Sequence, residues 1–329
     1  MKKVFSFVIK AVISIALIYL LVKFTKLDLV KAFSLLKEAD IRWFIASIAM
    51  YVICMFTNTY RWQILANQLD FKLEYLRALR LYFESTFSNN FLPTNFGGDA
   101  IRAFDLGRNH SHSWLKAAST VIMERAFGFA MMFSLIPLGL IYSKFTPLAH
   151  VLPENLERGL YITFGAMVIG LASYKLWSQI PLAFVQKIKF TIKEYTKCKK
   201  SLVNVALWTF LTHISFVIGN ICAGEALGAG LQQVPLWFWL ILSPVSTLAG
   251  FFIPAVKGVG AKEACYVYML GLVGVAPDLS LAIAFLTYIS TLISTLPGVT
   301  IAFRKLKTEK IIAEEEQHEE EELEELQKK

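Results

Sequence analysis

Long apolar runs, separated by shorter segments that carry most of the charges, dominate the pattern of this chain. The long runs reach the roughly 20 residues that a helix needs to cross the hydrocarbon core of a bilayer. In lipid each segment must satisfy its own backbone groups, so the expected structure is helical. The pattern predicts an all-α, polytopic transmembrane helix bundle of about seven or eight helices. The runs cover residues 4–24, 43–58, 117–142, 159–177, 202–222, 235–254, 264–275 and 279–303.

Composition supports this prediction. Of the 329 residues, 56% are hydrophobic and 18% are charged, whereas a soluble domain usually carries about a quarter charged residues. We attribute the net charge of +8 to cytoplasmic loops that face anionic lipid, and we expect no nucleic-acid partner. The four cysteines lack metal-ligand spacing, so we expect neither a metal nor a cofactor.

The distribution of charge predicts the domain organisation. We expect one transmembrane domain over residues 1–310, with pseudo-repeated halves at about 1–177 and 201–305, a basic loop at 178–200 and an acidic tail at 311–329. Segment 175–200 holds seven lysines, whereas segment 223–234 holds neither Lys nor Arg. The positive-inside rule therefore places the basic loop and the C-terminus in the cytoplasm. Basic residues between 26 and 42 oppose this scheme in the N-terminal half. The expected location is the plasma membrane, either a bacterial inner membrane or an archaeal cell membrane.

Two similar motifs interrupt the helical pattern. Residues 91–99 read FLPTNFGGD and residues 252–260 read FIPAVKGVG. Each is preceded by an apolar helix and followed by a short one, and in each a glycine lies four residues after the proline. Proline stops a helix and glycine frees the backbone, and broken helices at matching positions in two halves are typical of a transporter's midplane site. The motifs predict two re-entrant segments; the alternative is a pair of ordinary interhelical loops.

Charges near these motifs define the candidate site. The helix N-termini after the glycines would present N–H groups to an anion, and nearby cations would bind a phosphate. The pair Glu124–Arg125 lies inside an apolar run and should face the bundle or water. It either lines a headgroup pathway or forms a structural ion pair, with Arg125 bound to Asp99 or Glu84. The candidate substrate-binding residues are Pro93, Gly97, Gly98, Asp99, Arg102, Glu124, Arg125, Pro254, Lys257, Gly258, Gly260, Lys262 and Glu263.

Several of these motifs together resemble the lysylphosphatidylglycerol synthase transmembrane-region family. The resemblance rests on segment 89–103, which is followed by Glu124–Arg125, on a second block with Pro254, Gly258, Gly260 and Glu263, and on the closing Leu296–Pro297–Gly298. It extends from the first helix to about residue 305. The chain departs from the family pattern at 255–257, where members often have Pro-Gly, and around Thr287–Tyr288, where an arginine is common.

The resemblance implies a function. In bacterial aminoacyl-phospholipid synthases a similar membrane domain is held to translocate the modified lipid, while a separate soluble domain attaches the amino acid. This chain would then be a stand-alone, flippase-like translocase for an anionic phospholipid, an aminoacyl-phospholipid or a polyprenyl-linked glycolipid, without catalytic residues. Arg102, Arg125, Lys257 and Lys262 would meet the phosphate, and Asp99, Glu124 and Glu263 would orient these cations or bind a cationic headgroup.

Two other functions remain open from the sequence. One is a lipid-modifying transferase, similar to a phosphatidylglycerol lysyltransferase, with Asp99 or Glu263 as the base. The other is a membrane scaffold for a lipid or glycan pathway. The expected partner is a membrane lipid as substrate; a cytoplasmic or membrane-bound lipid-modifying enzyme and an oligomer are further alternatives.

Overall fold

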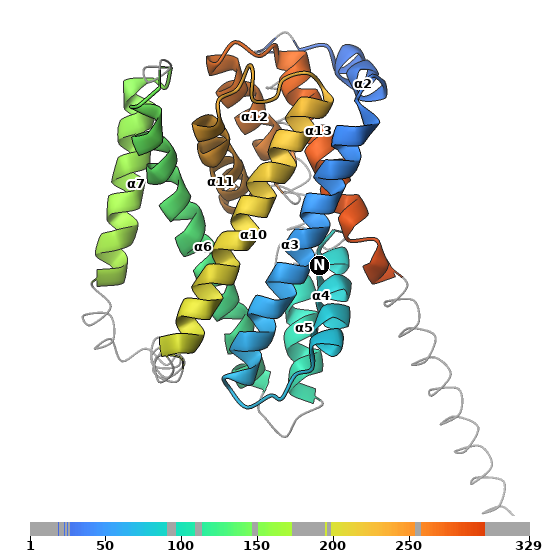
Figure 1. Ribbon diagram of the computed structural model, residues 1–329, viewed down its shortest axis with the longest axis vertical. Helices are drawn as coiled ribbons and strands as arrows, with labels where there is room; N and C mark the ends of the chain where they lie inside the picture. Colours follow the sequence, from blue (N-terminus) through green and yellow to red (C-terminus); the bar gives the residue numbers. More distant parts are fainter. Residues whose placement is uncertain are drawn as a thin grey trace, which may run out of the picture.

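The structure is a computed structural model that describes residues 27–90, 97–108, 114–146, 151–172, 199–253 and 258–299, together with residues 19, 23, 25 and 195. The regular elements of these residues are helices (Figure 1). In chain order they are α2 (Leu29–Lys37), α3 (Ile41–Asn67), α4 (Tyr75–Asn89), α5 (Gly97–Arg108), α6 (Trp114–Ser143), α7 (Glu154–Ala172), α10 (Lys199–Ala226), α11 (Leu236–Phe252), α12 (Ala261–Leu272) and α13 (Pro277–Ser294).

The prediction of an all-α membrane bundle is confirmed. Four helices, α3, α6, α10 and α13, are long and apolar enough to cross a membrane, and α11 is a shorter apolar helix. Large apolar side chains such as Ile45 of α3, Ile141 of α6 and Val203 of α10 are exposed on the outside. Exposed apolar surface on this scale is what a lipid-facing helix requires. The apolar run at 4–24, most of the basic loop at 178–200 and the acidic tail at 311–329 lie outside the described residues.

Helices α3 and α10 lie side by side and run in opposite directions. The amide of Asp40, before α3, donates to the carbonyl of Ala226 at the end of α10. At the other end of the pair, the side chain of Gln68 accepts a hydrogen bond from Ser201 near the start of α10. Each of these two helices begins a similar series, in which a long helix precedes a hairpin of two shorter helices and a further membrane-length helix follows.

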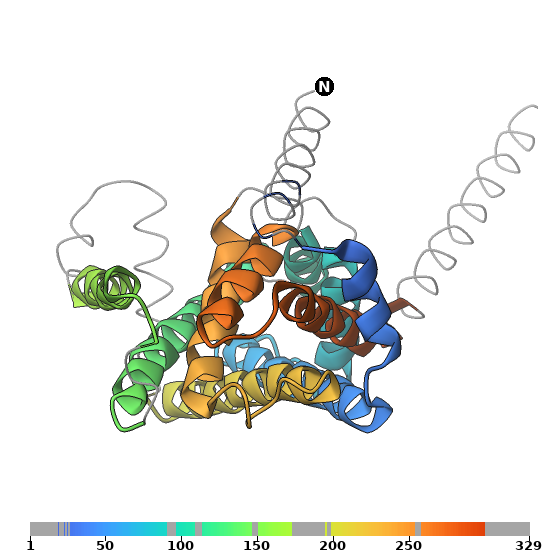
Figure 2. The same ribbon diagram turned by 90° about the horizontal axis from the view of Figure 1, so that it is seen from above.

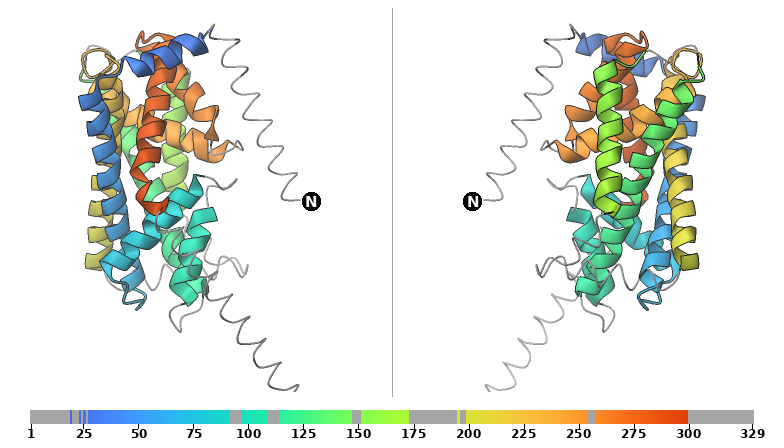
Figure 3. Two further views of the ribbon diagram at one scale, coloured as in Figure 1. Left: turned by 90° about the vertical axis from the view of Figure 1, so that its right-hand side faces the viewer. Right: turned by 90° about the vertical axis from the view of Figure 1, so that its left-hand side faces the viewer.

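The two hairpins therefore enter the bundle from opposite ends. Helices α4 and α5 occupy the lower end in Figure 1, whereas α11 and α12 occupy the upper end, and Figure 3 shows the same separation from the side. Helix α7 lies between the two series in the chain and returns it to the lower end. It also lies outside the other helices, beside α6 (Figure 2). The short helix α2 lies across the upper end (Figure 3), where Asp28 caps it by accepting hydrogen bonds from the amides of Val30 and Lys31.

A glycine closes each hairpin. A Cβ on Gly98 would overlap the carbonyl oxygen of Ser85 in α4, and a Cβ on Gly258 would overlap the backbone of Gly250 in α11. Gly258 also has a φ of 70°, a left-handed conformation that favours glycine. Each hairpin can pack this closely because a glycine lies where its second arm starts, Gly98 in the first turn of α5 and Gly258 shortly before α12.

Two further glycines allow the two series of helices to pack closely against each other. A Cβ on Gly139 of α6 would lie 2.9 Å from the carbonyl oxygen of Trp237 in α11, and a Cβ on Gly298 would overlap the carbonyl of Phe83 in α4. Each series therefore packs its closing segment against the hairpin of the other. Lipid tails are as apolar as leucine, so close packing at small residues, rather than escape from water, holds such helices together.

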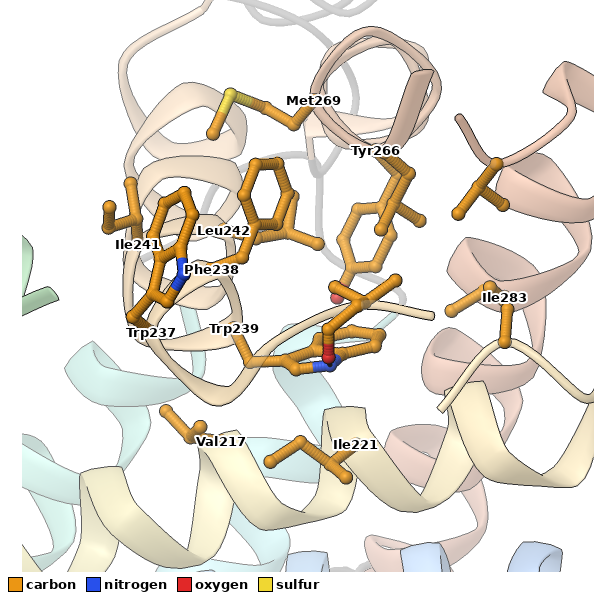
Figure 4. Close-up of a cluster of buried hydrophobic side chains, with 14 of the residues drawn as sticks. Val217, Ile221, Trp237, Phe238, Trp239, Ile241, Leu242, Tyr266, Met269 and Ile283 are labelled. Carbon is orange, nitrogen blue, oxygen red and sulfur yellow. Dashed lines mark hydrogen bonds between the residues drawn. The ribbon is translucent and has the colours of Figure 1, made fainter. Parts of the chain in front are cut away.

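The largest apolar cluster surrounds α11. Trp237, Phe238 and Trp239 are fully buried among side chains of α10, α12 and α13, including Val217, Ile221, Tyr266, Met269 and Ile283 (Figure 4). A second cluster around Trp62 joins α3, α4, α5, α6 and α10. Each hairpin is thus held by its own core.

Two sequence expectations about helices differ from the structure. The helix before the first motif was expected to be apolar, but α4 is amphipathic and includes Arg77, Arg80 and Glu84. The expectation failed because α4 buries one face, whereas α11 buries residues around its circumference. The second apolar run was expected to cover residues 43–58, with Arg61 just beyond its end, but α3 extends from Ile41 to Asn67 and buries Arg61 against the bundle.

Candidate functional site

Buried charges from α3, α5 and α6 meet in the interior of the first series of helices. Arg61 comes from α3, Asp99 and Arg102 from α5, and Glu124 and Arg125 from α6. Arg61 lies on the face of α3 that also buries Cys54, Thr57 and Leu65, because these positions recur every three or four residues. We call these five charged residues the ion-pair network.

Glu124 is the centre of this network. Its Oε1 lies 2.9 Å from Nη2 of Arg61 and its Oε2 lies 2.8 Å from Nη2 of Arg102. The hydroxyl of Tyr82 in α4 also donates a hydrogen bond of 2.9 Å to Oε1. Glu124 is only 2% exposed, so one carboxylate joins side chains of three other helices away from solvent.

Asp99 joins α5 to α6. Its Oδ2 accepts from Nε of Arg125 at 2.9 Å and lies 2.7 Å from Nη2 of the same residue, while its Oδ1 accepts from Arg102 at 3.2 Å. The sequence left open whether Arg125 pairs with Asp99 or Glu84, and the structure shows Asp99. At the start of α5, the amide of Gly98 donates a hydrogen bond to Oδ1 of Asn89.

Arg102 is sealed inside the protein. It is 1% exposed, and its guanidinium carbon lies 4.5 Å from the ring centre of Trp62 and 4.6 Å from that of Tyr82. Such contacts stabilise a buried cation through the electron-rich ring faces. Trp62 is fixed in turn by a hydrogen bond of 3.0 Å from its indole nitrogen to Thr120. In this conformation Arg102 stabilises the network from within the protein interior and is not accessible to a ligand.

Arg125 is the most exposed member of the network. Its side chain is 39% exposed, compared with 6% or less for the other four charged side chains. It borders a cavity of about 210 Å³ that lies between α3, α4, α6, α10 and α11. We call this the central cavity; its lining includes Asn58, Arg61, Glu124, Arg125, His213, Thr247 and Phe251. The network thus borders a partly open, mainly apolar space, with several polar side chains in its lining, where the first series of helices faces α10 and α11.

The second motif does not join the ion-pair network in the part of the chain that the structure describes. Glu263 is buried and accepts a hydrogen bond of 2.6 Å from the amide of Gly260, so it caps the start of α12. The aliphatic part of Lys262 packs over Gly250, where a Cβ would lie 2.5 Å from Cε of the lysine. Pro93, Pro254 and Lys257, which were also expected at the site, lie outside the described residues.

The second series carries an uncharged counterpart of the network. The hydroxyl of Tyr266 in α12 donates to Oδ1 of Asn220 in α10, and Tyr51 and Thr287 lie beside them. Tyr266 lies three residues after Glu263, as Arg102 lies three after Asp99.

The structure therefore brings together Asp99, Arg102, Glu124 and Arg125 beside Gly97 and Gly98, and it keeps Gly258, Gly260, Lys262 and Glu263 at the other hairpin. Their substrate-binding roles remain predictions. The sequence analysis missed Arg61, Trp62 and Tyr82. Arg61 could have been found from its spacing, since it continues the buried face of Cys54 and Thr57. In the described part of the chain, no three His, Cys, Asp or Glu side chains are grouped as metal ligands would be.

These features define a class: a helical membrane protein with two opposed hairpins and an ion-pair network at its centre. The family model described as "Lysylphosphatidylglycerol synthase TM region" matches residues 7–298, and the chain belongs to this family. The resemblance inferred from the motifs is thereby confirmed. The comparisons with curated proteins and with solved structures found no match.

Proposed function

We propose that this protein moves a lipid with an anionic, phosphate-bearing headgroup between the leaflets of the plasma membrane. The observation that carries the proposal is the ion-pair network. Its most exposed cation, Arg125, borders the central cavity. Charged side chains inside a membrane are costly and usually mark a substrate path. The family supports a role in membrane lipid biology.

The charge of the network favours an anion. Its three guanidinium groups face two carboxylates, so one positive charge is left over within the network. A phosphate diester beside Arg125 would balance that charge and accept hydrogen bonds from the guanidinium. Arg125 is therefore our main headgroup contact, while Arg102 and Glu124 hold the helices that position it.

The arrangement of the hairpins supports a mechanism. In this proposal the two series act as halves related by an inverted repeat, and both hairpins are re-entrant segments. Rocking of one series against the other would open the central cavity to each side in turn. Lys262 would contact the headgroup during this passage.

The orientation of the protein is also part of the proposal. The positive-inside rule places the segment that leads into α10, with its lysines, in the cytoplasm. The end of the bundle where α3 ends and α10 begins would then be cytoplasmic, and α2 would lie on the opposite surface. The C-terminus would be cytoplasmic as well.

The test is reconstitution of the purified protein into liposomes that contain fluorescent phosphatidylglycerol or fluorescent phosphatidylcholine. Label that reaches the outer leaflet is bleached with time. The wild type should accelerate bleaching of the anionic lipid more than that of the zwitterionic lipid. Arg125→Gln should slow it by about tenfold or more, because hydrogen bonds to charged groups contribute about 1.5–3 kcal/mol. Arg125→Lys should lie between them, since it keeps the charge and loses the planar fork.

Arg158→Gln is the matched control. Arg158 also pairs with a carboxylate, at 2.6 Å from Glu154, but both side chains are exposed. Its loss should leave transport unchanged. Equal rates for both lipids, or full activity of Arg125→Gln, would refute the proposed role of the network.

A further inference from the structure

A second cavity lies on the outer side of the bundle. It has a volume of about 290 Å³ and opens between α6, α7 and α11. We call it the lateral groove; its walls include Phe133 and Ile136 of α6, Leu160 and Phe164 of α7, and Leu248 and Phe252 of α11. Figures 1 and 2 show α7 on the outside of the bundle beside α6.

The groove offers no free polar group to a ligand in its described lining. Thr163 is the one polar residue there, and its hydroxyl donates to the carbonyl of Gly159 within α7. A peptide or sugar in the groove would leave its own polar groups unsatisfied, at a cost of several kcal/mol in an apolar setting. A hydrocarbon chain has no such requirement.

Three phenylalanines separate the lateral groove from the central cavity. Phe129 and Phe251 line the central cavity, whereas Phe252 lines the groove. The ring centres of Phe129 and Phe251 lie 4.7 Å apart, and those of Phe251 and Phe252 lie 5.4 Å apart. The third distance, from Phe129 to Phe252, is 6.1 Å. Two neighbouring residues of α11, Phe251 and Phe252, thus line the central cavity and the lateral groove respectively.

We propose that the lateral groove holds the hydrocarbon chain of a lipid whose headgroup occupies the central cavity, with Phe129, Phe251 and Phe252 at the boundary between them. This inference rests on the proposed function and adds a binding site for the other part of the substrate. The ligand class is an amphiphile with an anionic phosphate headgroup. The apolar lining of the groove, and the aromatic cluster that borders both spaces, favour a hydrocarbon chain as the occupant.

The selectivity of the groove for one lipid over another must come from binding of the headgroup. Membrane lipid tails are as apolar as the groove, so moving a chain from the bilayer into it gains little free energy. A chain should therefore be enriched in the groove only when its headgroup is bound beside Arg125. This dependence distinguishes a substrate site from ordinary lipid contact.

The experiment uses photo-crosslinking in nanodiscs. The probes are phosphatidylglycerol and phosphatidylcholine, each with a diazirine near the end of one acyl chain, and adducts are mapped by mass spectrometry. We expect adducts at the groove to be about fivefold more frequent with the anionic probe, which corresponds to about 1 kcal/mol. Adducts near Ile45 and Ile53, on the exposed face of α3, should show no such preference.

Two tryptophan variants provide matched controls. Leu160→Trp fills the groove, whereas Ile162→Trp adds the same ring two residues away at a position that is 64% exposed. Leu160→Trp should abolish the headgroup preference at the remaining groove residues, and Ile162→Trp should leave it unchanged. Similar melting temperatures would show that both variants are folded.

The outcomes separate this inference from the proposed function. Groove adducts without preference for the anionic probe, or a preference that survives Leu160→Trp, would overturn the groove site even if the protein transports lipid. Conversely, a groove preference in a protein that moves no lipid would support the groove as a lipid site and refute translocation. Loss of the preference in Arg125→Gln would show that both spaces bind one molecule.

Discussion

At the residue scale, the interior of this protein depends on Glu124, because it connects α6 to arginines of α3 and α5 and to a tyrosine of α4. Each charged side chain of the network has neighbours of opposite charge, and these offset the free-energy cost of its burial. Removing one partner leaves the others buried without compensation. The network is therefore both the candidate binding site and a structural junction.

The first prediction follows from this double role. Glu124→Gln should lower the free energy of unfolding by about 3–5 kcal/mol, because two buried guanidinium groups lose their shared carboxylate. Thermal denaturation in detergent would measure the loss. Glu157→Gln is the control, since Glu157 lies 3.7 Å from an exposed Lys144 and its pair should contribute about 0–1 kcal/mol. Equal melting temperatures for both variants would contradict a structural role for Glu124.

The sequence predicted part of this site. Glu124 and Arg125 were identified because charges inside apolar runs are rare and must face the interior, whereas Asp99 and Arg102 were identified because they follow the first Pro-Gly motif. Arg61 was assigned to the end of a membrane run, since a sequence alone does not show whether an arginine at such a place is buried or reaches the headgroups. The aromatic support of Arg102 by Trp62 and Tyr82 depends on tertiary packing between α3, α4 and α5, which local pattern does not reveal.

At the scale of the elements, each hairpin depends on a glycine where its second arm meets its first. The sequence placed these turns correctly because Pro and Gly mark them. It did not predict that α4 would be amphipathic, since the apolar pattern around it is short and its buried polar residues pack against other helices. The proline-containing tips lie outside the described residues.

The second prediction concerns the first hairpin. Gly98→Ala should destabilise the protein by about 1–3 kcal/mol, because a methyl group at this position forces α5 away from α4. It should also disturb the Asp99 pairs, which lie one residue further. Gly165→Ala in α7 is the control, because no atom lies within 4 Å of its added Cβ. A melting temperature of Gly98→Ala at or above that of Gly165→Ala would contradict the tight contact.

At the scale of the whole molecule, the antiparallel α3 and α10 place the two hairpins at opposite ends. The sequence predicted membrane-spanning helices and two interruptions, because both follow from local composition. It did not establish that the closing segment of each series packs against the hairpin of the other, as Gly139 and Gly298 show. Such an arrangement depends on the direction of every helix.

The third prediction tests the proposed orientation. In a variant without native cysteines, Glu74→Cys before α4 should react with a membrane-impermeant maleimide only after the cytoplasmic side is opened. Gln232→Cys, between α10 and α11, should react in intact cells. Both positions are exposed and lie at opposite ends of the bundle. The reverse pattern of labelling would show that the proposed orientation is wrong.

The contrast between the charged first series and the neutral cluster of Tyr266 and Asn220 has an energetic consequence. If two inverted halves were chemically identical, the states open to either side of the membrane would have equal free energy. Among the described residues the buried ion pairs join helices of the first series, so in the proposed mechanism the empty protein should have a preferred resting state. A ligand can shift that equilibrium only by its difference in affinity for the two states. The chemical difference between the halves would thus determine which leaflet an unloaded molecule faces.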